Sequence, residues 1–332
     1  GTSTPGTQST VTGQSGIGIS LVDTNAIENI QVIGNTVEDF ANNGIQLNTA
    51  AAANLNNISI IGNTIRNCDY GIQRIGSSGD GNFTTVVGNT IVDSQATAIA
   101  FSVAAARNLD CNISFNTIDT CVGVGMGVNG TRLNLSGNNI KDVPSSAMYL
   151  TASIDVLISG GIIDNCGGGA GDGDRVINDT NATPTSKVEG VKILNAQSAT
   201  SIIDGVQEVT NCDIEAAAVL LGSRGIDDVQ YVRGNNLVNT GLRLLKDKSV
   251  CTGNHIVIAT NPSVAYLRVG AVNDSIVTNN YVECTSGGTR AAIEETTGAD
   301  YNIIEHNNVR NRGTGAAITV VGANTISGNN VT

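Results

Sequence analysis

A short segment built around Gly-Asn-Thr-Ile returns along the whole chain, and it constrains the fold more than any other feature. It reads VIGNTVEDF at 32–40, IIGNTIRNC at 60–68, VVGNTIVDS at 86–94 and ISFNTIDTC at 113–121. With the asparagine as a marker, copies lie 19 to 28 residues apart, except for one gap of 51 residues that a degenerate copy near Gly190 divides. Self-similarity at this period is typical of a solenoid. The markers are Asn35, Asn63, Asn89, Asn116, Asn138, Gly161, Cys212, Asn235, Asn254, Asn280, Asn307 and Asn329.

The repeated unit has the pattern of strands and not of helices. Stretches such as NIQVI and NISII alternate polar and apolar residues before the marker, and a third stretch such as GIQLN follows later. Helical periodicity is missing, and Gly and Asn punctuate every copy. Three short strands per copy predict an all-β, single-stranded parallel β-helix of about 13 turns, with equivalent strands about 4.8 Å apart. We expect this β-helix over 16–332, after a flexible lead-in at 1–15.

The marker asparagines are interpreted as part of the scaffold. We expect each to form a tight bend, because Asn tolerates the left-handed backbone region and its amide can bond neighbouring backbone. Stacked copies would then bond to one another in a ladder. Cys68, Cys121 and Cys166 share one offset after the marker, which predicts a stack of buried thiols. None of the seven cysteines has CxxC spacing, so we expect no zinc site. A stack of buried thiols favours assembly in a reducing compartment.

Composition excludes several classes of partner. Lys and Arg number 17 against 29 Asp and Glu, which gives a net charge of −12 without any basic run. Such a chain lacks the clustered cations that a nucleic acid requires. No apolar stretch is long enough to span a membrane. The segment GGAGDGD at 168–174 has part of a calcium-binding pattern, but it occurs once with its Asp displaced, so we expect neither a metal nor a cofactor.

The repeats resemble those of right-handed parallel β-helix proteins of the pectin-lyase-like superfamily, over roughly residues 15–332. This resemblance implies a right-handed coil and a polysaccharide partner. The signatures of uronan epimerases and polygalacturonases are missing, and the Trp motifs of pectate lyases cannot occur because the chain has no Trp. The chain is therefore most similar to phage tailspikes and related depolymerases. That similarity implies a homotrimer at a virion surface or tail, or an extracellular protein, assembled in a reducing cytoplasm.

The resemblance also indicates where to look for a site, namely the outward residues of the third strand in each copy. The longest departure from the repeat is an insertion at about 166–187, which contains Asp172 and Asp174. Paired carboxylates can hydrolyse a glycosidic bond, so these two are candidate catalytic residues. The alternative is a solvated acidic loop. The candidate binding residues are Gln46, Gln73, Tyr149, Arg175, Arg243 and Arg268.

A second candidate patch comprises Arg243, Arg268 and Glu294, with Glu295 beside them, on three successive turns. Arginine pairs bidentately with carboxylates, which suits a uronic-acid polymer, and Glu294 is the third candidate catalytic residue. The alternative is an Arg–Glu surface ladder. The strand of the preceding turn is predicted at 218–221, and Asp227 and Asp228 are predicted to form a turn in the segment that follows.

The sequence thus leads to a hypothesis and an alternative. The hypothesis is a protein that binds and cleaves a surface or extracellular polysaccharide, by hydrolysis in preference to elimination. The alternative is a β-helix without catalysis that serves as a fibre shaft, an adhesin or a carbohydrate-binding spacer. The low aromatic content of 3% favours the alternative, because sugar sites commonly stack rings on aromatic side chains.

Overall fold

The computed structural model describes most of the chain, which divides into two compact units. The first unit comprises 1–166 and 179–186, and the second comprises 167–178 and 187–332. Strands account for the regular structure of the described residues, and no helix there is long and apolar enough to cross a membrane. The predicted lead-in at 1–15 lies outside them. The described ranges are 16–21, 27–49, 54–76, 81–101, 108–168, 175–181, 183–198, 200–217, 224–259, 266–285, 289–312 and 314–332.

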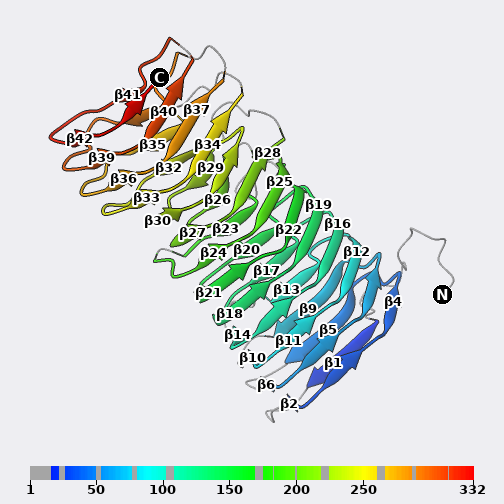
Figure 1. The fold of residues 1–332 in the computed structure, drawn as a ribbon. Helices are drawn as coiled ribbons and strands as arrows, with labels where there is room; N and C mark the ends of the chain where they lie inside the picture. Colours follow the sequence, from blue (N-terminus) through cyan, green and yellow to red (C-terminus); the bar gives the residue numbers. More distant parts are fainter. Residues whose placement is uncertain are drawn as a thin grey trace. The chain divides into compact units, whose positions relative to one another are not determined.

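Every complete turn adds strands to three parallel sheets, which we call A, B and C (Figure 1). In the first unit, sheet A consists of β1 (Ile17–Leu21), β5 (Asn43–Thr49), β9 (Tyr70–Gly76), β13 (Ile99–Phe101), β17 (Met126–Val128) and β20 (Met148–Leu150). Sheet A of the second unit consists of β23 (Ile177–Asp179, as far as Asn178), β26 (Ser201–Asp204), β29 (Arg224–Asp227), β32 (Gly241–Leu244), β35 (Leu267–Val269), β38 (Ile293–Glu295) and β41 (Ile318–Thr319).

Sheet B precedes the marker in every copy. In the first unit it consists of β2 (Ile27–Glu28), β3 (Gln31–Ile33), β6 (Leu55–Asn56), β7 (Ser59–Ile61), β10 (Gly81–Asn82), β11 (Thr85–Val87), β14 (Asn108–Leu109), β15 (Asn112–Ser114), β18 (Thr131–Ser136) and β21 (Ile154–Ser159). In the second unit it consists of β24 (Lys187–Glu189), β27 (Glu208–Thr210), β30 (Tyr231–Arg233), β33 (Val250–Thr252), β36 (Ile276–Thr278), β39 (Ile303–Glu305) and β42 (Thr325–Ser327).

Sheet C follows the marker. In the first unit it consists of β4 (Thr36–Glu38), β8 (Thr64–Arg66), β12 (Thr90–Ser94), β16 (Thr117–Cys121), β19 (Asn139–Val143) and β22 (Ile162–Cys166). In the second unit it consists of β25 (Lys192–Ala196), β28 (Asp213–Ala216), β31 (Asn236–Val238), β34 (His255–Ile258), β37 (Tyr281–Cys284), β40 (Asn308–Asn311) and β43 (Asn330–Val331).

The predicted all-β parallel β-helix is confirmed, with slightly fewer turns than the 13 expected. Within the described residues, five turns in the first unit and six in the second have strands in all three sheets. The first strand, β1, and the last two, β42 and β43, belong to incomplete turns. The turn of β21 to β23 is divided between the units.

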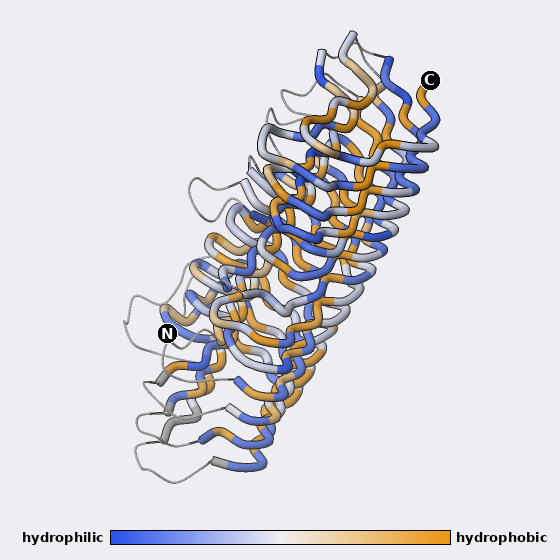
Figure 2. Tube along the Cα trace, turned by 90° about the vertical axis from the view of Figure 1, so that its left-hand side faces the viewer, coloured by the Kyte–Doolittle hydropathy of each residue, from blue (hydrophilic) through white to orange (hydrophobic). Residues whose placement is uncertain are grey.

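Alternation along each strand separates the core from the surface. In the register of β3, β7 and β11, Val32 pairs with Ile60 and Ile60 with Val86, and all three are buried. The residues on either side of each are exposed or half-buried. Residues of like hydropathy therefore recur at the same place in successive turns of each unit (Figure 2). These strands thus present their outer residues, which include the exposed Ile33, at a fixed register.

The predicted asparagine ladder is confirmed at the bend between sheets B and C. The backbone N–H and the side-chain amide of Asn63 both donate to Oδ1 of Asn89, at 2.9 Å each. The Asn63 amide also donates to the Val32 carbonyl at 2.9 Å. Asn89 repeats this pattern on Asn116, and both are fully buried. In the second unit the same contacts link Asn235, Asn254, Asn280, Asn307 and Asn329.

The left-handed residue at this bend is not the marker asparagine, so that part of the prediction is wrong. The residue before the marker has the positive φ, which is 63° at Gly62 and 65° at Gly88. Glycine adopts this conformation without the strain that a Cβ would cause. Phe115 occupies the same place with a φ of 55° and an exposed ring. The asparagine therefore contributes its amide, and its neighbour makes the turn.

The cysteines are buried as predicted, but they do not form a continuous stack. All seven are thiols without a disulfide. Cys121 is paired in register with Ser94, and Cys166 with Val143, so other residues alternate with the thiols in this column. Burial raises the pKa of the Cys68 and Cys121 thiols to about 11.

Replacing a central rung of the ladder should destabilise the protein. In Asn89→Ala the two Asn63 donors lose their acceptor inside the core, and each buried donor without a partner costs about 1–3 kcal/mol. We therefore expect the free energy of unfolding to fall by about 3 kcal/mol, as measured by urea denaturation. Asn35→Ala is the matched control, because Asn35 donates to the next rung but accepts from no other rung among the described residues, and it is half-buried. Equal losses for the two variants would contradict the ladder.

The buried thiols should be unreactive in the native protein. A thiol with a pKa of about 11 has very little thiolate at pH 8, and the thiolate is the reactive form. We expect no labelling of the native protein by a disulfide reagent at pH 8, and labelling of all seven thiols in urea. Rapid labelling of a native thiol would show that burial does not protect it.

Candidate functional site

The outer face of sheet A in the second unit carries a column of polar and charged side chains. The residues of this column are paired in register on neighbouring strands. Each follows a core residue of its strand, as Asp204 follows Ile203 and Arg243 follows Leu242. Because paired strands are about 4.8 Å apart, one side chain faces outward at each such step. The sheet A column, in order, is Asn178, Asp204, Asp227, Arg243, Arg268, Glu294 and Thr319.

Asp227 and Arg243 form the most tightly bound pair in the column. The arginine donates from Nε to Oδ1 at 2.6 Å and from Nη2 to Oδ2 at 2.5 Å, which is the bidentate geometry of a guanidinium on a carboxylate. Nη1 of Arg224 lies 3.6 Å from Asp227 Oδ2. The Asp227 side chain is only 7% exposed. Two guanidinium groups thus balance one buried carboxylate.

Asp204 lies beside Asp227 in a different environment. The two residues are paired in register on β26 and β29, so their carboxylates project from neighbouring strands. Asp204 forms an ion pair with Arg175 and is mostly buried. Burial raises the pKa of Asp204; the Arg175 cation opposes this effect, and the Asp227 and Asp228 charges add to it. The protonated form of Asp204 is therefore favoured relative to an aspartate in water.

Positive charge accumulates on the other side of Asp227. Burial lowers the pKa of Arg224 below its usual value, and the cations of Arg243 and Arg268 lower it further. Arg268 has no ion pair among the described residues, and its Nε is buried without a hydrogen-bond partner there. A bound anion would give this guanidinium a partner and relieve the repulsion among the three arginines.

The structure brings three of the predicted site residues together. Arg243, Arg268 and Glu294 occupy successive positions of the column, as expected. Arg175 precedes β23, and Asn178 takes the predicted place of Arg175 in the register. The Arg175 guanidinium still contacts the column through its ion pair with Asp204.

Two of the predicted catalytic residues cannot be placed. Asp172 and Asp174 lie outside the described residues, and their role stays a prediction.

The remaining predicted residues belong to the first unit. Gln46 and Gln73 are register neighbours on β5 and β9. Tyr149 lies further along the same sheet, paired with Gly127. No Asp, Glu, Lys or Arg occupies this register in the described part of the first unit, in contrast to the column of the second.

The sequence prediction missed Asp204 and Asp227. Asp227 was expected in a turn, but it is the last residue of β29, so that expectation is wrong. Asp228 does form the bend, with a φ of 52°. The predicted strand at 218–221 lies outside the described residues, and β29 begins at Arg224. The signal that could have placed Asp227 on the outward face is the Ile-Asp ending that β26 and β29 share.

Glu295 does not belong to the outward face. Its side chain is buried and accepts hydrogen bonds from the amides of Asn302 at 3.0 Å and Asn324 at 2.6 Å, and from the Val321 N–H at 3.2 Å. Burial raises the pKa of this carboxyl. Glu295 therefore joins neighbouring turns in the core. Among the described residues no cluster of His, Cys, Asp or Glu is suited to hold a metal ion.

Breaking the buried pair in the column should destabilise the second unit. Asp227→Asn leaves Arg243 and Arg224 without their carboxylate, and removing one partner of a buried pair costs about 3–5 kcal/mol. We expect a loss of this size in urea denaturation. The matched control is Asp110→Asn, which breaks an exposed bidentate pair with Arg132 and should have a much smaller effect. Similar losses in both variants would contradict the difference in burial.

One comparison with a solved structure supports the fold. A mannuronic-acid-specific polysaccharide family 6 lyase from human gut microbiota is similar, with a TM-score of 0.50 and 10% identity, over 95% of this chain and 82% of that one. The A-module of a mannuronan C-5 epimerase from Azotobacter vinelandii has a TM-score of 0.36 at 15% identity, over 95% and 80% of the two chains. No protein-family model matches the sequence, and no curated protein does.

Proposed function

We propose that the protein binds an acidic polysaccharide along the sheet A column of the second unit and hydrolyses it. The observation that carries this proposal is the pair of carboxylates of Asp204 and Asp227 on neighbouring strands, flanked by arginines. Two carboxylates in different environments are the basis of glycosidic hydrolysis. The similarity in fold to a polysaccharide lyase supports a polysaccharide as the partner.

Binding would rest on the arginines. Arg268 has a buried donor without a partner among the described residues, and a uronate carboxylate can accept from it. The order Arg243, Arg268, Glu294 then sets side chains in contact with successive parts of a chain laid across the strands. A polymer with a carboxylate on each sugar suits this arrangement better than a neutral one.

Cleavage would begin with a proton from Asp204. Its raised pKa suits a general acid, which protonates the glycosidic oxygen as the bond to the anomeric carbon breaks. Carboxyl groups about 5–5.5 Å apart are typical of retaining enzymes, in which the second carboxylate attacks the anomeric carbon and water later releases the sugar. The register pairing of β26 and β29, with strands about 4.8 Å apart, is consistent with this spacing. Asp172, Asp174 and Glu294 remain predicted candidates for the second role.

Elimination is the second candidate reaction. Pairing of a uronate carboxylate with Arg268 would acidify the proton on sugar C5, and a lyase removes that proton. The similar structure of a mannuronic-acid-specific lyase is consistent with this chemistry on the same fold. The products distinguish the two reactions, because elimination leaves an unsaturated sugar that absorbs ultraviolet light and hydrolysis does not.

The biological setting follows from the sequence resemblance alone. We propose that the protein is a homotrimer at a virion surface or tail, or is extracellular, as tailspike depolymerases are. Sedimentation of the protein in solution tests the trimer, and a monomer at working concentration would contradict it.

Removal of the proton donor should abolish cleavage. We incubate the protein with a panel of mannuronate, galacturonate and glucuronate polymers and measure new reducing ends. Asp204→Asn should lower the rate by at least about 100-fold, since general acid catalysis contributes about 100-fold to 10,000-fold. Asp110→Asn, in the first unit and outside the candidate site, controls for the loss of an aspartate carboxylate. Absence of cleavage of every polymer by the unaltered protein would refute the enzymatic proposal and favour the binding or shaft alternative.

The pH dependence should respond to the neighbours of Asp204 with opposite signs. The acid must be protonated, so kcat/KM falls as pH rises through the Asp204 pKa. The Asp228 charge raises that pKa, so Asp228→Asn should move the fall to lower pH. The Arg175 cation lowers it, so Arg175→Ala should move the fall to higher pH. Shifts of the same sign in both variants would exclude Asp204 as the acid.

A further inference from the structure

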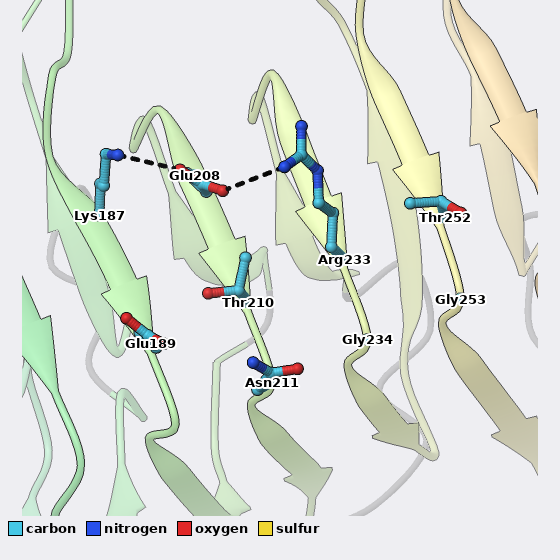
Figure 3. Close-up of a pocket in the computed structure, with 9 residues that line it drawn as sticks. All are labelled: Lys187, Glu189, Glu208, Thr210, Asn211, Arg233, Gly234, Thr252 and Gly253. Carbon is cyan, nitrogen blue, oxygen red and sulfur yellow. Dashed lines mark ion pairs between the residues drawn. The ribbon is translucent and has the colours of Figure 1, made fainter.

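A groove of about 580 Å³ opens on the outer face of sheet B in the second unit, away from the sheet A column (Figure 3). It crosses β24, β27, β30 and β33. Glu189, Thr210, Arg233 and Thr252 follow one another across it in register. A molecule that lies across these strands therefore meets a carboxylate, a hydroxyl, a guanidinium and a second hydroxyl in turn.

The groove is open because the residues at its floor are small. Gly234 and Gly253 make the bends that follow β30 and β33, with a φ of 65° each. A Cβ added at Gly253 would find its nearest neighbouring atom 3.9 Å away, so the space there is free. The Asn211 side chain occupies the space at Gly234, where its Oδ1 would lie 2.6 Å from an added Cβ. The short side chains of Thr210 and Thr252 leave the middle of the groove free as well.

Charged side chains line one edge of the groove, in a row over three strands (Figure 3). Glu208 lies between Lys187, whose Nζ is 3.2 Å from Oε2, and Arg233, whose Nη1 is 3.8 Å from Oε1. The longer contact exceeds hydrogen-bond distance, so Arg233 keeps donors for another acceptor. Its side chain is 47% exposed. The guanidinium carbon lies 5.2 Å above the centre of the Tyr231 ring, which helps to orient it.

We propose that this sheet B groove is a second, non-catalytic binding site for an acidic sugar chain. Arg233 would hold a sugar carboxylate, and the hydroxyls of Thr210 and Thr252 and the amide of Asn211 would bond the sugar hydroxyls. The class of ligand rests on the proposed function, but the place of binding does not. A second site on another face would hold a further segment of the polymer and raise the overall affinity by effective concentration.

The test counts binding events by calorimetry. The probes are oligosaccharides of mannuronate, galacturonate and glucuronate, and the protein carries Asp204→Asn so that they are not consumed. We expect two events with at least one probe. Arg233→Ala should weaken one of them about tenfold or more, because it removes a charged hydrogen-bond donor. Thr252→Trp fills the groove and should abolish the same event. Thr278→Trp is the matched control, since Thr278 is paired in register with Thr252 but lies outside the groove.

The outcomes separate this inference from the proposed function. Arg268→Ala should weaken the event that Thr252→Trp leaves intact. A single event that is lost in Arg268→Ala and kept in Arg233→Ala and Thr252→Trp would overturn the groove alone. A single event that is kept in Arg268→Ala but lost in Arg233→Ala and Thr252→Trp would support the groove and overturn binding at the sheet A column. No binding of any probe would overturn both.

Discussion

The buried amide ladder is the interaction on which the remaining structure depends. Asn89 accepts two hydrogen bonds from Asn63 and donates to Asn116, so the position of one turn fixes the next. Because these amides are buried, leaving them unpaired is costly, which makes a shift by one residue costly. Such a shift would also exchange the inner and outer faces of each strand. In the second unit this ladder begins at Asn235 and so supports the alignment of the column from Arg243 onward. The turn of Asp227 has Cys212 at the marker, which bonds to Asn235 through its backbone N–H.

That alignment creates an electrostatic contrast within an acidic chain. The protein has a net charge of −12, yet in the second unit Arg224 and Arg243 pair with one buried carboxylate and Arg268 follows on the next strand. On the neighbouring strand, burial favours the protonated form of Asp204. Two aspartates on adjacent strands thus acquire different properties from their neighbours alone. Different properties for chemically identical groups are what acid–base catalysis requires.

The sequence predicts the scaffold better than the site, for physical reasons. The spacing of Asn63 and Asn89 reports a repeated bend, and the alternation around Arg243 and Arg268 reports an outward face. Asp227 was missed because the apolar run at 218–221 matches a strand better than the Arg-Gly-Ile-Asp of β29. The pairing of Arg175 with Asp204 could not be predicted, since it joins a residue before a strand to another turn. Local patterns report alternation, whereas ion pairs depend on three-dimensional proximity.

The glycine that precedes the marker asparagine has a consequence beyond the bend. Gly62, Gly88 and Phe115 have nearly the same positive φ at this place, so their turns leave the corner in the same direction and begin the next strand at the same height. Equivalent side chains on successive turns are therefore separated by steps of about 4.8 Å, the spacing between paired strands. Insertion or deletion of a whole copy between the turns of Asp204 and Arg268 would change the separation of these two residues by one strand spacing. A scaffold of this kind could follow the repeat length of a polymer by changing the number of turns between two fixed side chains.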